Sequence, residues 1–154
     1  MKYLAIFTIA TISILSSSCD ESESIESELT NFWAEHHQLE WDSTSTANKL
    51  VGTWKLTYRY CCPESSTPGE TRNVENENYR LSITSDKIYV FIDGELTQES
   101  DWSLKTQDVE LFGVDAEPFV ANTFGRILFA DNKVLFNGSY IDGADNYFVK
   151  LIEN

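Results

Sequence analysis

Basic residues are scarce in this sequence, which has 11 Lys and Arg against 25 Asp and Glu over 154 residues. The formal net charge of −14 repels the phosphates of nucleic acids, so no nucleic-acid partner is expected. It also repels anionic lipid headgroups, so a basic patch cannot hold the chain on a membrane. The acidic excess is typical of a well-solvated surface and identifies no partner by itself.

The residue patterns of common active sites are missing. The sequence has no Gly-x-Ser-x-Gly elbow, no Ser-x-x-Lys pair, no phosphate-binding glycine loop and no His-Glu-x-x-His motif. Its two histidines, His36 and His37, are adjacent, so on a helix they point about 100° apart and cannot share a metal ion. The segment 142–146 (DGADN) lacks the spaced ligands and the final Glu of a calcium loop and is typical of a turn. We therefore expect no metal and no cofactor.

A glycoside hydrolase is the alternative, because the sequence contains a group of carboxylates and paired carboxylates can hydrolyse glycosides. Three acidic residues are close in sequence: Glu110, Asp115 and Glu117. In a chain this acidic, such a group is expected without any function. The sequence therefore predicts a protein that is not an enzyme.

Cysteine is also rare. Two of the three cysteines, Cys61 and Cys62, are adjacent, and in an oxidising compartment they can form a disulfide. Neighbouring Cα atoms lie about 3.8 Å apart, below the usual disulfide range, so the bond would be strained and would close almost no loop. We expect a structural role for the pair, as a local stiffening of the chain. Two free thiols, a thiol-reactive site and a metal site stay open as alternatives.

Long apolar runs are missing except at the N-terminus. There, the charge-free segment 4–15 follows Lys2 and precedes the serines 16–18. A membrane-spanning helix needs about 20 apolar residues, so this layout predicts a signal peptide over residues 1–18. Cys19, directly after the serines, resembles the lipidated first residue of mature bacterial lipoproteins. Ordinary signal cleavage near Ser18, which leaves Cys19 a free thiol, is the alternative.

The lipoprotein resemblance implies an exported protein that a lipid on Cys19 anchors to the outer membrane. Acidic residues directly after the cysteine resemble the surface-export signals of some Gram-negative lipoproteins, which implies the cell surface. Residues 19–48 are expected to form a lipidated acidic tether: 20–28 is charged and lacks aromatic residues, which predicts disorder. Within the tether, apolar spacing over 29–41 predicts a short helix, and small polar residues predict a linker over 43–48. The folded domain is expected over residues 49–154.

From Leu50 onward the spacing of apolar residues changes to alternation, which is typical of half-buried strands. In the first strand, Trp54, Leu56, Tyr58 and Tyr60 fall on one face. Seven more strands are predicted at 79–84, 87–92, 96–106, 109–114, 124–130, 133–139 and 146–152. Short turns join most of them, which favours antiparallel neighbours in an up-and-down order. The prediction is an all-β fold, a small eight-stranded antiparallel up-and-down barrel, with a two-sheet sandwich as the alternative.

The predicted barrel has one long connection and several strands that are apolar on both faces. The connection 61–78 contains two prolines and many polar residues, which favours a lid, a binding loop or a disordered segment. Strands 87–92, 124–130 and 133–139 are apolar on both faces, so their outer face needs a cover. The segment 29–41 or a partner is the candidate for that cover.

The first strand opens with a glycine–any–tryptophan motif, Gly52-Thr53-Trp54, which resembles the lipocalins and more closely the small bacterial lipocalin-like lipoproteins. The long loop after the first strand and the final segment 147–151 extend this resemblance over residues 49–154. The resemblance implies that Trp54 plugs the closed end of the barrel beside Gly52, with Lys150 of the last strand packed over it. A cation over an indole face contributes about 0.5–2 kcal/mol.

The resemblance also implies an internal cavity that holds a small hydrophobic ligand. Strand alternation gives the candidate ligand-binding residues: Leu56, Tyr58, Tyr60, Tyr79, Leu81, Ile83, Trp102 and Leu104. An eight-stranded barrel is wide enough either to hold one small ligand or to be filled by its own side chains. The leading hypothesis is a lipid-anchored envelope protein that binds a small apolar ligand in its barrel. The alternative is a filled barrel that acts as a surface interaction module for proteins or glycans, and the sequence names no protein partner.

Overall fold

The computed structural model describes residues 21–39, 41–61, 71–73, 78–108 and 111–152. The predicted signal peptide, the lipidation site Cys19 and the second cysteine of the possible disulfide, Cys62, lie outside these ranges. Most of the connection 61–78 and the acidic residue Glu110 also lie outside them. Within the described ranges, no helix is long and apolar enough to cross a membrane.

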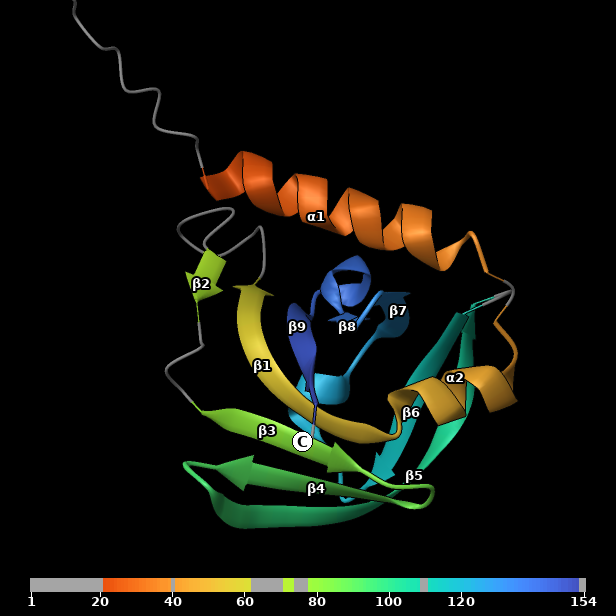
Figure 1. Ribbon diagram of the computed structural model, residues 1–154, viewed down its shortest axis with the longest axis vertical. Coiled ribbons are helices and arrows are strands. Elements are labelled where there is room, and N and C mark those ends of the chain that lie inside the picture. Colours follow the sequence, from red (N-terminus) through yellow and green to blue (C-terminus); the bar gives the residue numbers. More distant parts are fainter. Residues whose placement is uncertain (1–20, 40, 62–70, 74–77, 109–110, 153–154) are drawn as a thin grey trace, which may run out of the picture.

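Across its described residues the chain forms two α-helices followed by nine strands (Figure 1). The helices are α1 (Glu21–His36) and α2 (Ser43–Leu50). The strands are β1 (Gly52–Cys61), β2 (Thr71–Asn73), β3 (Tyr79–Ile83), β4 (Lys87–Ile92), β5 (Glu95–Asp108), β6 (Leu111–Glu117), β7 (Arg126–Ala130), β8 (Lys133–Asn137) and β9 (Ala144–Leu151). Two short 3₁₀ helices, η2 (Ala121–Thr123) and η3 (Ser139–Ile141), lie in the connections before β7 and after β8.

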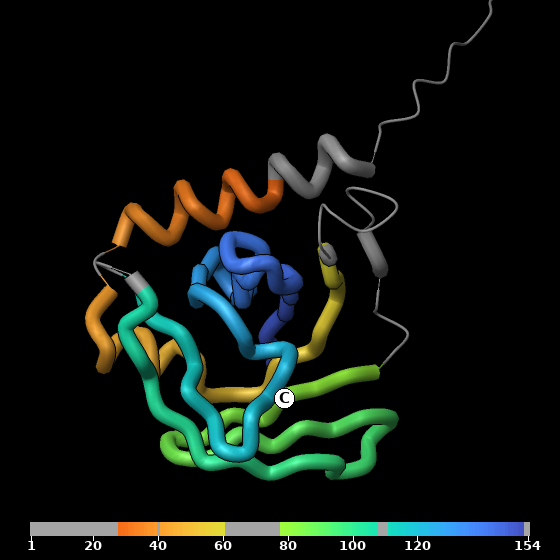
Figure 2. The backbone as a smooth tube through the Cα atoms, turned by 180° about the vertical axis from the view of Figure 1, so that it is seen from behind, coloured from red at the N-terminus to blue at the C-terminus, as the bar shows by residue number. Residues whose placement is uncertain are grey.

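The strands form one antiparallel sheet in the order β6-β5-β4-β3-β1-β9-β8-β7, and the short β2 pairs with β1. Strands that follow one another in the chain are neighbours from β3 to β6 and from β7 to β9, and β9 pairs with β1. The two ends of the order then approach each other: a Cβ on Gly113 of β6 would lie 2.8 Å from the carbonyl oxygen of Gly125, just before β7. The sheet therefore curls into a nearly closed barrel (Figures 1 and 2). The eight-stranded antiparallel up-and-down barrel is confirmed, and the sandwich alternative is wrong.

The inner face of the barrel is packed with apolar side chains. Trp54 and Leu56 of β1 share one buried cluster with Leu81 of β3, Phe136 of β8 and Phe148 of β9. The Phe136 and Phe148 rings meet edge to face, with centroids 5.6 Å apart. Strands supply these residues from every second position because neighbouring side chains point to opposite faces. Each fully buried side chain of this size stabilises the fold by about 1.5–3 kcal/mol.

A second apolar cluster lies on the outside of the barrel, beneath α1. Phe32 of α1 is 1% exposed and belongs to one cluster with Leu128 of β7, Leu135 of β8 and Tyr147 of β9. The Phe32 and Tyr147 rings are nearly perpendicular, with centroids 5.7 Å apart. Figure 1 shows α1 lying across this side of the barrel. Helix α1 thus supplies the predicted cover for the outer face of β7 and β8, whereas β4, the third strand predicted to need a cover, contributes no residue to this cluster.

The N-terminal segment is more regular than the sequence predicted. The stretch 20–28, expected to be disordered, is helical from Glu21 onward, and α1 ends at His36, short of the predicted end at residue 41. The stretch 43–48, expected to be a linker, belongs to α2. A capping box starts this helix, because Asp42 Oδ1 accepts a hydrogen bond from Ser45 N and Ser45 Oγ accepts one from Asp42 N. Since both helices pack on the barrel, the folded unit begins before residue 49.

Candidate functional site

One end of the barrel is closed by the tryptophan of the sequence motif. Trp54 has no exposed surface, and its indole Nε1 donates to Leu50 O at 2.6 Å. Lys150 lies over the ring, with Nζ 5.0 Å from the ring centroid, and Nζ also donates to Val51 O at 2.7 Å. Gly52 has a φ of +136°, and a Cβ there would lie 2.5 Å from Lys150 Cε, so a side chain at this position would displace the lysine. The structure therefore brings the three predicted plug residues together.

The predicted ligand-binding residues deepest in the barrel point inward, but they are tightly packed. Leu56 and Leu81 are 0% exposed, and Ile83 is 2% exposed. A side chain that lines a ligand-sized cavity keeps accessible surface on the cavity side, and these three have almost none. This part of the lumen is filled by the protein's own side chains.

Two other predicted ligand-binding residues, Tyr58 and Tyr60, lie on the outside of the barrel. A β-bulge causes this, because Leu56 and Tyr58 pair with consecutive residues of β9. Thr57 is the extra residue, and it reverses which side chains of β1 point inward from there on. Tyr58 is 36% exposed, and Tyr60 packs on the outer cluster beneath α1. The prediction from simple alternation was wrong at these two positions.

The same bulge turns Arg59 inward at the other end of the barrel, where it builds a polar network. Its guanidinium donates to Asn146 Oδ1 at 3.1 Å and to Asn122 Oδ1 at 3.0 Å. Tyr79, a predicted ligand-binding residue, packs edge-on against Phe148 with ring centroids 6.2 Å apart. Burial raises the pKa of Tyr79 to about 12. A hydrogen bond with Asn122 and the charge of Arg59 lower this pKa by a smaller amount. The phenol is therefore neutral at physiological pH and can serve as a hydrogen-bonding group.

The last two predicted ligand-binding residues, Trp102 and Leu104, pack against the inner core cluster and also line an open groove between α2 and β5. The groove has a volume of about 430 Å³, which is within the range of small-molecule sites. Its other lining residues come mainly from α2 and carry small or polar side chains: Ser43, Thr44, Ala47, Asn48, Ser85 and Ser103. The Trp102 indole Nε1 donates to Thr84 O at 3.0 Å, which fixes the orientation of the ring. This groove is the candidate binding site.

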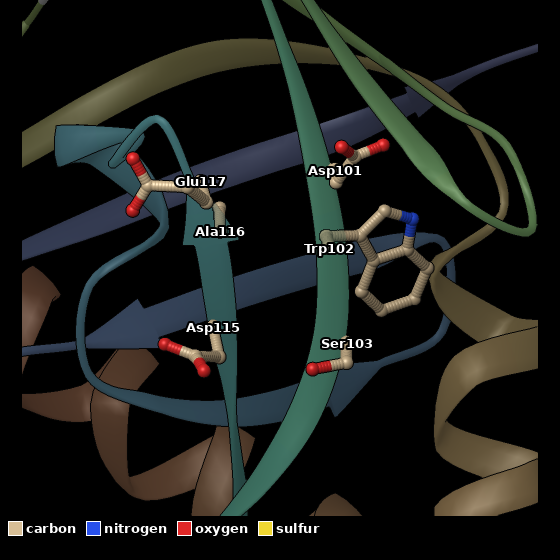
Figure 3. Close-up of a pocket in the computed structure, with 6 residues that line it drawn as sticks. All are labelled: Asp101, Trp102, Ser103, Asp115, Ala116 and Glu117. Carbon is tan, nitrogen blue, oxygen red and sulfur yellow. The ribbon is translucent and has the colours of Figure 1, made fainter.

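A second open pocket, of about 270 Å³, lies where β5 pairs with β6 and is bordered by carboxylates (Figure 3). Figure 3 shows Asp115 and Glu117 of β6 pointing away from the Trp102 indole. Both carboxylates are exposed, and Asp115 Oδ1 lies 3.8 Å from Lys105 Nζ. A carboxylic acid that donates a proton at neutral pH needs shielding from water, which this surface does not give. Glu110, the third residue of the enzyme alternative, lies outside the described residues.

Sequence reasoning missed one wall of the candidate groove and the polar network. Ser43, Thr44 and Asn48 fall in the predicted linker, although the Asp42-x-x-Ser45 pattern is a capping box that marks a helix start. For Arg59 the sequence holds no comparable signal, because the pattern of apolar residues does not reveal a bulge.

Comparisons with protein-family models, with curated proteins and with solved structures find no match. In the part of the chain that the structure describes, no group of three His, Cys, Asp or Glu side chains is arranged to hold a metal ion.

Proposed function

We propose that this protein is an exported, lipocalin-like lipoprotein whose filled barrel acts as a surface interaction module. A lipid on Cys19 would anchor it to the outer membrane, and the groove between α2 and β5 would contact the ligand. The barrel itself then serves as a rigid support that holds the groove in shape.

The packing of the lumen carries this proposal. Leu56, Leu81 and Ile83 have 0–2% exposed surface, so an apolar ligand could enter only if the core opened. Opening a well-packed core exposes apolar surface at a cost of about 25 cal/mol for each Å². The groove has no such cost, because it is already open and holds the half-buried Trp102. Binding at this groove therefore fits the geometry better than carriage of an apolar molecule deep inside the barrel.

The position of the helices agrees with an outward-facing groove. The proposed anchor, Cys19, precedes the first residue of α1 by two positions. A helix of 16 residues spans about 24 Å, and Figure 1 shows the start of α1 and the helix α2 at opposite sides of the molecule. A lipid at residue 19 would thus hold the groove away from the membrane.

A titration with palmitate and with a hydrophobic dye tests whether the barrel is filled. Binding is followed by intrinsic tryptophan fluorescence, to which Trp54 in the lumen contributes. We expect no saturable change for the native protein. The matched control is Leu81→Ala, which should create a cavity and so gain a saturable response. The opposite result has two parts: the ligand quenches the fluorescence of the native protein stoichiometrically, and Leu81→Phe abolishes this quenching. That result would show that the lumen holds the ligand and would refute the proposed function.

A further inference from the structure

We propose that the groove between α2 and β5 binds a neutral saccharide, stacked on Trp102 and hydrogen-bonded by the hydroxyl and amide groups of α2. This inference rests on the proposed function, a filled barrel whose groove beside α2 contacts the ligand. It adds the chemical class of the ligand and the residues that recognise it.

The groove is neutral in a strongly acidic protein. The chain has 25 carboxylates and 11 basic side chains, yet the eight lining residues include no charged one. Charged side chains of both signs stand directly beside them in sequence: Asp42 before Ser43, Lys49 after Asn48, and Asp101, which pairs with Lys87, before Trp102. A charged ligand of either sign would meet a like charge beside the groove and no countercharge in its lining, and a purely apolar ligand would leave the hydroxyl groups without partners. A neutral ligand with many hydroxyl groups avoids both costs.

The polar side chains of α2 share one face of the helix. Thr44, Ala47 and Asn48 are separated by three and four positions, which places them together on the helix surface. The opposite face carries Thr46 and Leu50, which are 1% and 0% exposed and face the barrel. Hydroxyl and amide groups both donate and accept hydrogen bonds, as the hydroxyl groups of a sugar require. The small side chain of Ala47 leaves room between them for a ring.

Trp102 supplies the stacking surface. Its backbone N donates to Asp86 O at 3.2 Å and its indole Nε1 donates to Thr84 O at 3.0 Å, so both the strand and the ring are fixed. The electron-rich face of an indole attracts the slightly positive C–H groups of a pyranose ring. Because the ring is already held in place, binding does not have to order it, which favours affinity.

The test uses the protein purified as the cell produces it, in a detergent without a sugar headgroup. It is titrated with neutral cello-, xylo-, malto- and chito-oligosaccharides and with an anionic oligogalacturonate, by calorimetry and by tryptophan fluorescence. Trp102→Ala removes the stacking surface. Thr44→Arg fills the groove from an exposed helix position without changing the core, and Thr30→Arg on α1 is the matched control.

We expect at least one neutral oligosaccharide to bind, with the oligogalacturonate binding more weakly. Thr44→Arg and Trp102→Ala should each weaken that binding about tenfold or more, whereas Thr30→Arg should leave it unchanged. Should Trp102→Ala fail to fold, Thr44→Arg decides the outcome alone.

Two results overturn the inference: no neutral saccharide binds at millimolar concentration, or binding survives Thr44→Arg unchanged. The palmitate titration separates this failure from that of the proposed function. Without saccharide binding and without palmitate binding, the filled barrel stands and only the ligand class is wrong. Saturable palmitate binding that Leu81→Phe abolishes overturns both.

Discussion

Acid should destabilise this protein through one buried histidine that holds α1 against the barrel. His36 is the last residue of α1 and is 4% exposed. Its Nδ1 accepts a hydrogen bond from the backbone N–H of Phe129 in β7 at 3.2 Å. The imidazole stacks on Trp41, with centroids 5.5 Å apart, and Trp41 Nε1 donates back to His36 O at 3.0 Å. Because Nδ1 acts as an acceptor, the ring must be neutral in the folded protein.

The size of the effect follows from the pKa of this ring. Burial, with a further contribution from the neighbouring His37, lowers the pKa of His36 from 6.5 to about 4. Between these values the unfolded chain binds a proton that the folded chain does not, so the free energy of unfolding falls as the pH falls. The stability is fully present above about pH 6.5, and a shift of this size removes about 3 kcal/mol by pH 4.

Urea unfolding at pH 7 and at pH 4, followed by circular dichroism, measures this loss. The comparison is with His36→Gln, whose side-chain oxygen can still accept the hydrogen bond from Phe129 but does not titrate. The native protein should lose about 3 kcal/mol more than this variant over the same interval. His37→Gln is the control and should keep most of the pH dependence, because burial of His36 is the larger cause. Equal losses in the native protein and in His36→Gln would refute the reasoning.

Two further predictions concern the plug and the anchor. Trp54→Ala should lower the free energy of unfolding by about 3–5 kcal/mol, because the ring is fully buried and hydrogen-bonded, and an unchanged thermal melt would exclude its role as a plug. Cys19→Ala should move the protein from the membrane fraction to the soluble fraction. The control variant Cys62→Ala should remain in the membrane fraction. A Cys19→Ala protein that still sediments with membranes would contradict lipidation.

The strands of this barrel could be predicted because each one buries a single face. In β3, Leu81 and Ile83 point into the core, and in β4, Ile88 and Val90 do the same. A period of two survives in the sequence wherever one face meets the core and the other meets water. Tight turns then leave antiparallel pairing as the simplest connection between such strands. The barrel follows from these two local patterns, even though no single strand specifies it.

Two departures from local pattern made the rest harder to predict: a bulge changes which residues of β1 face the lumen, and helix α2 forms one wall of the candidate site. The bulge at Thr57 moves Tyr58 and Tyr60 to the outside, and no residue near it differs visibly from ordinary strand composition. Helix α2 has little apolar periodicity, since Leu50 is the one large apolar residue of the segment Ser43–Leu50. Its existence depends on the capping box and on packing against the barrel, which outweigh the turn-like composition.

These departures together determine where a ligand can bind. Trp54 and Lys150 close one end of the barrel, and the hydrogen-bonded network of Arg59 occupies the other. Breaking that network would leave a partly buried guanidinium without its acceptors, at a cost of about 1–3 kcal/mol for each group left unpaired. An apolar ligand would therefore have to disrupt a partly buried polar network or the indole plug before it reached the core. The groove between α2 and β5 has neither barrier, and α2, which forms one of its walls, is the element that the sequence pattern conceals.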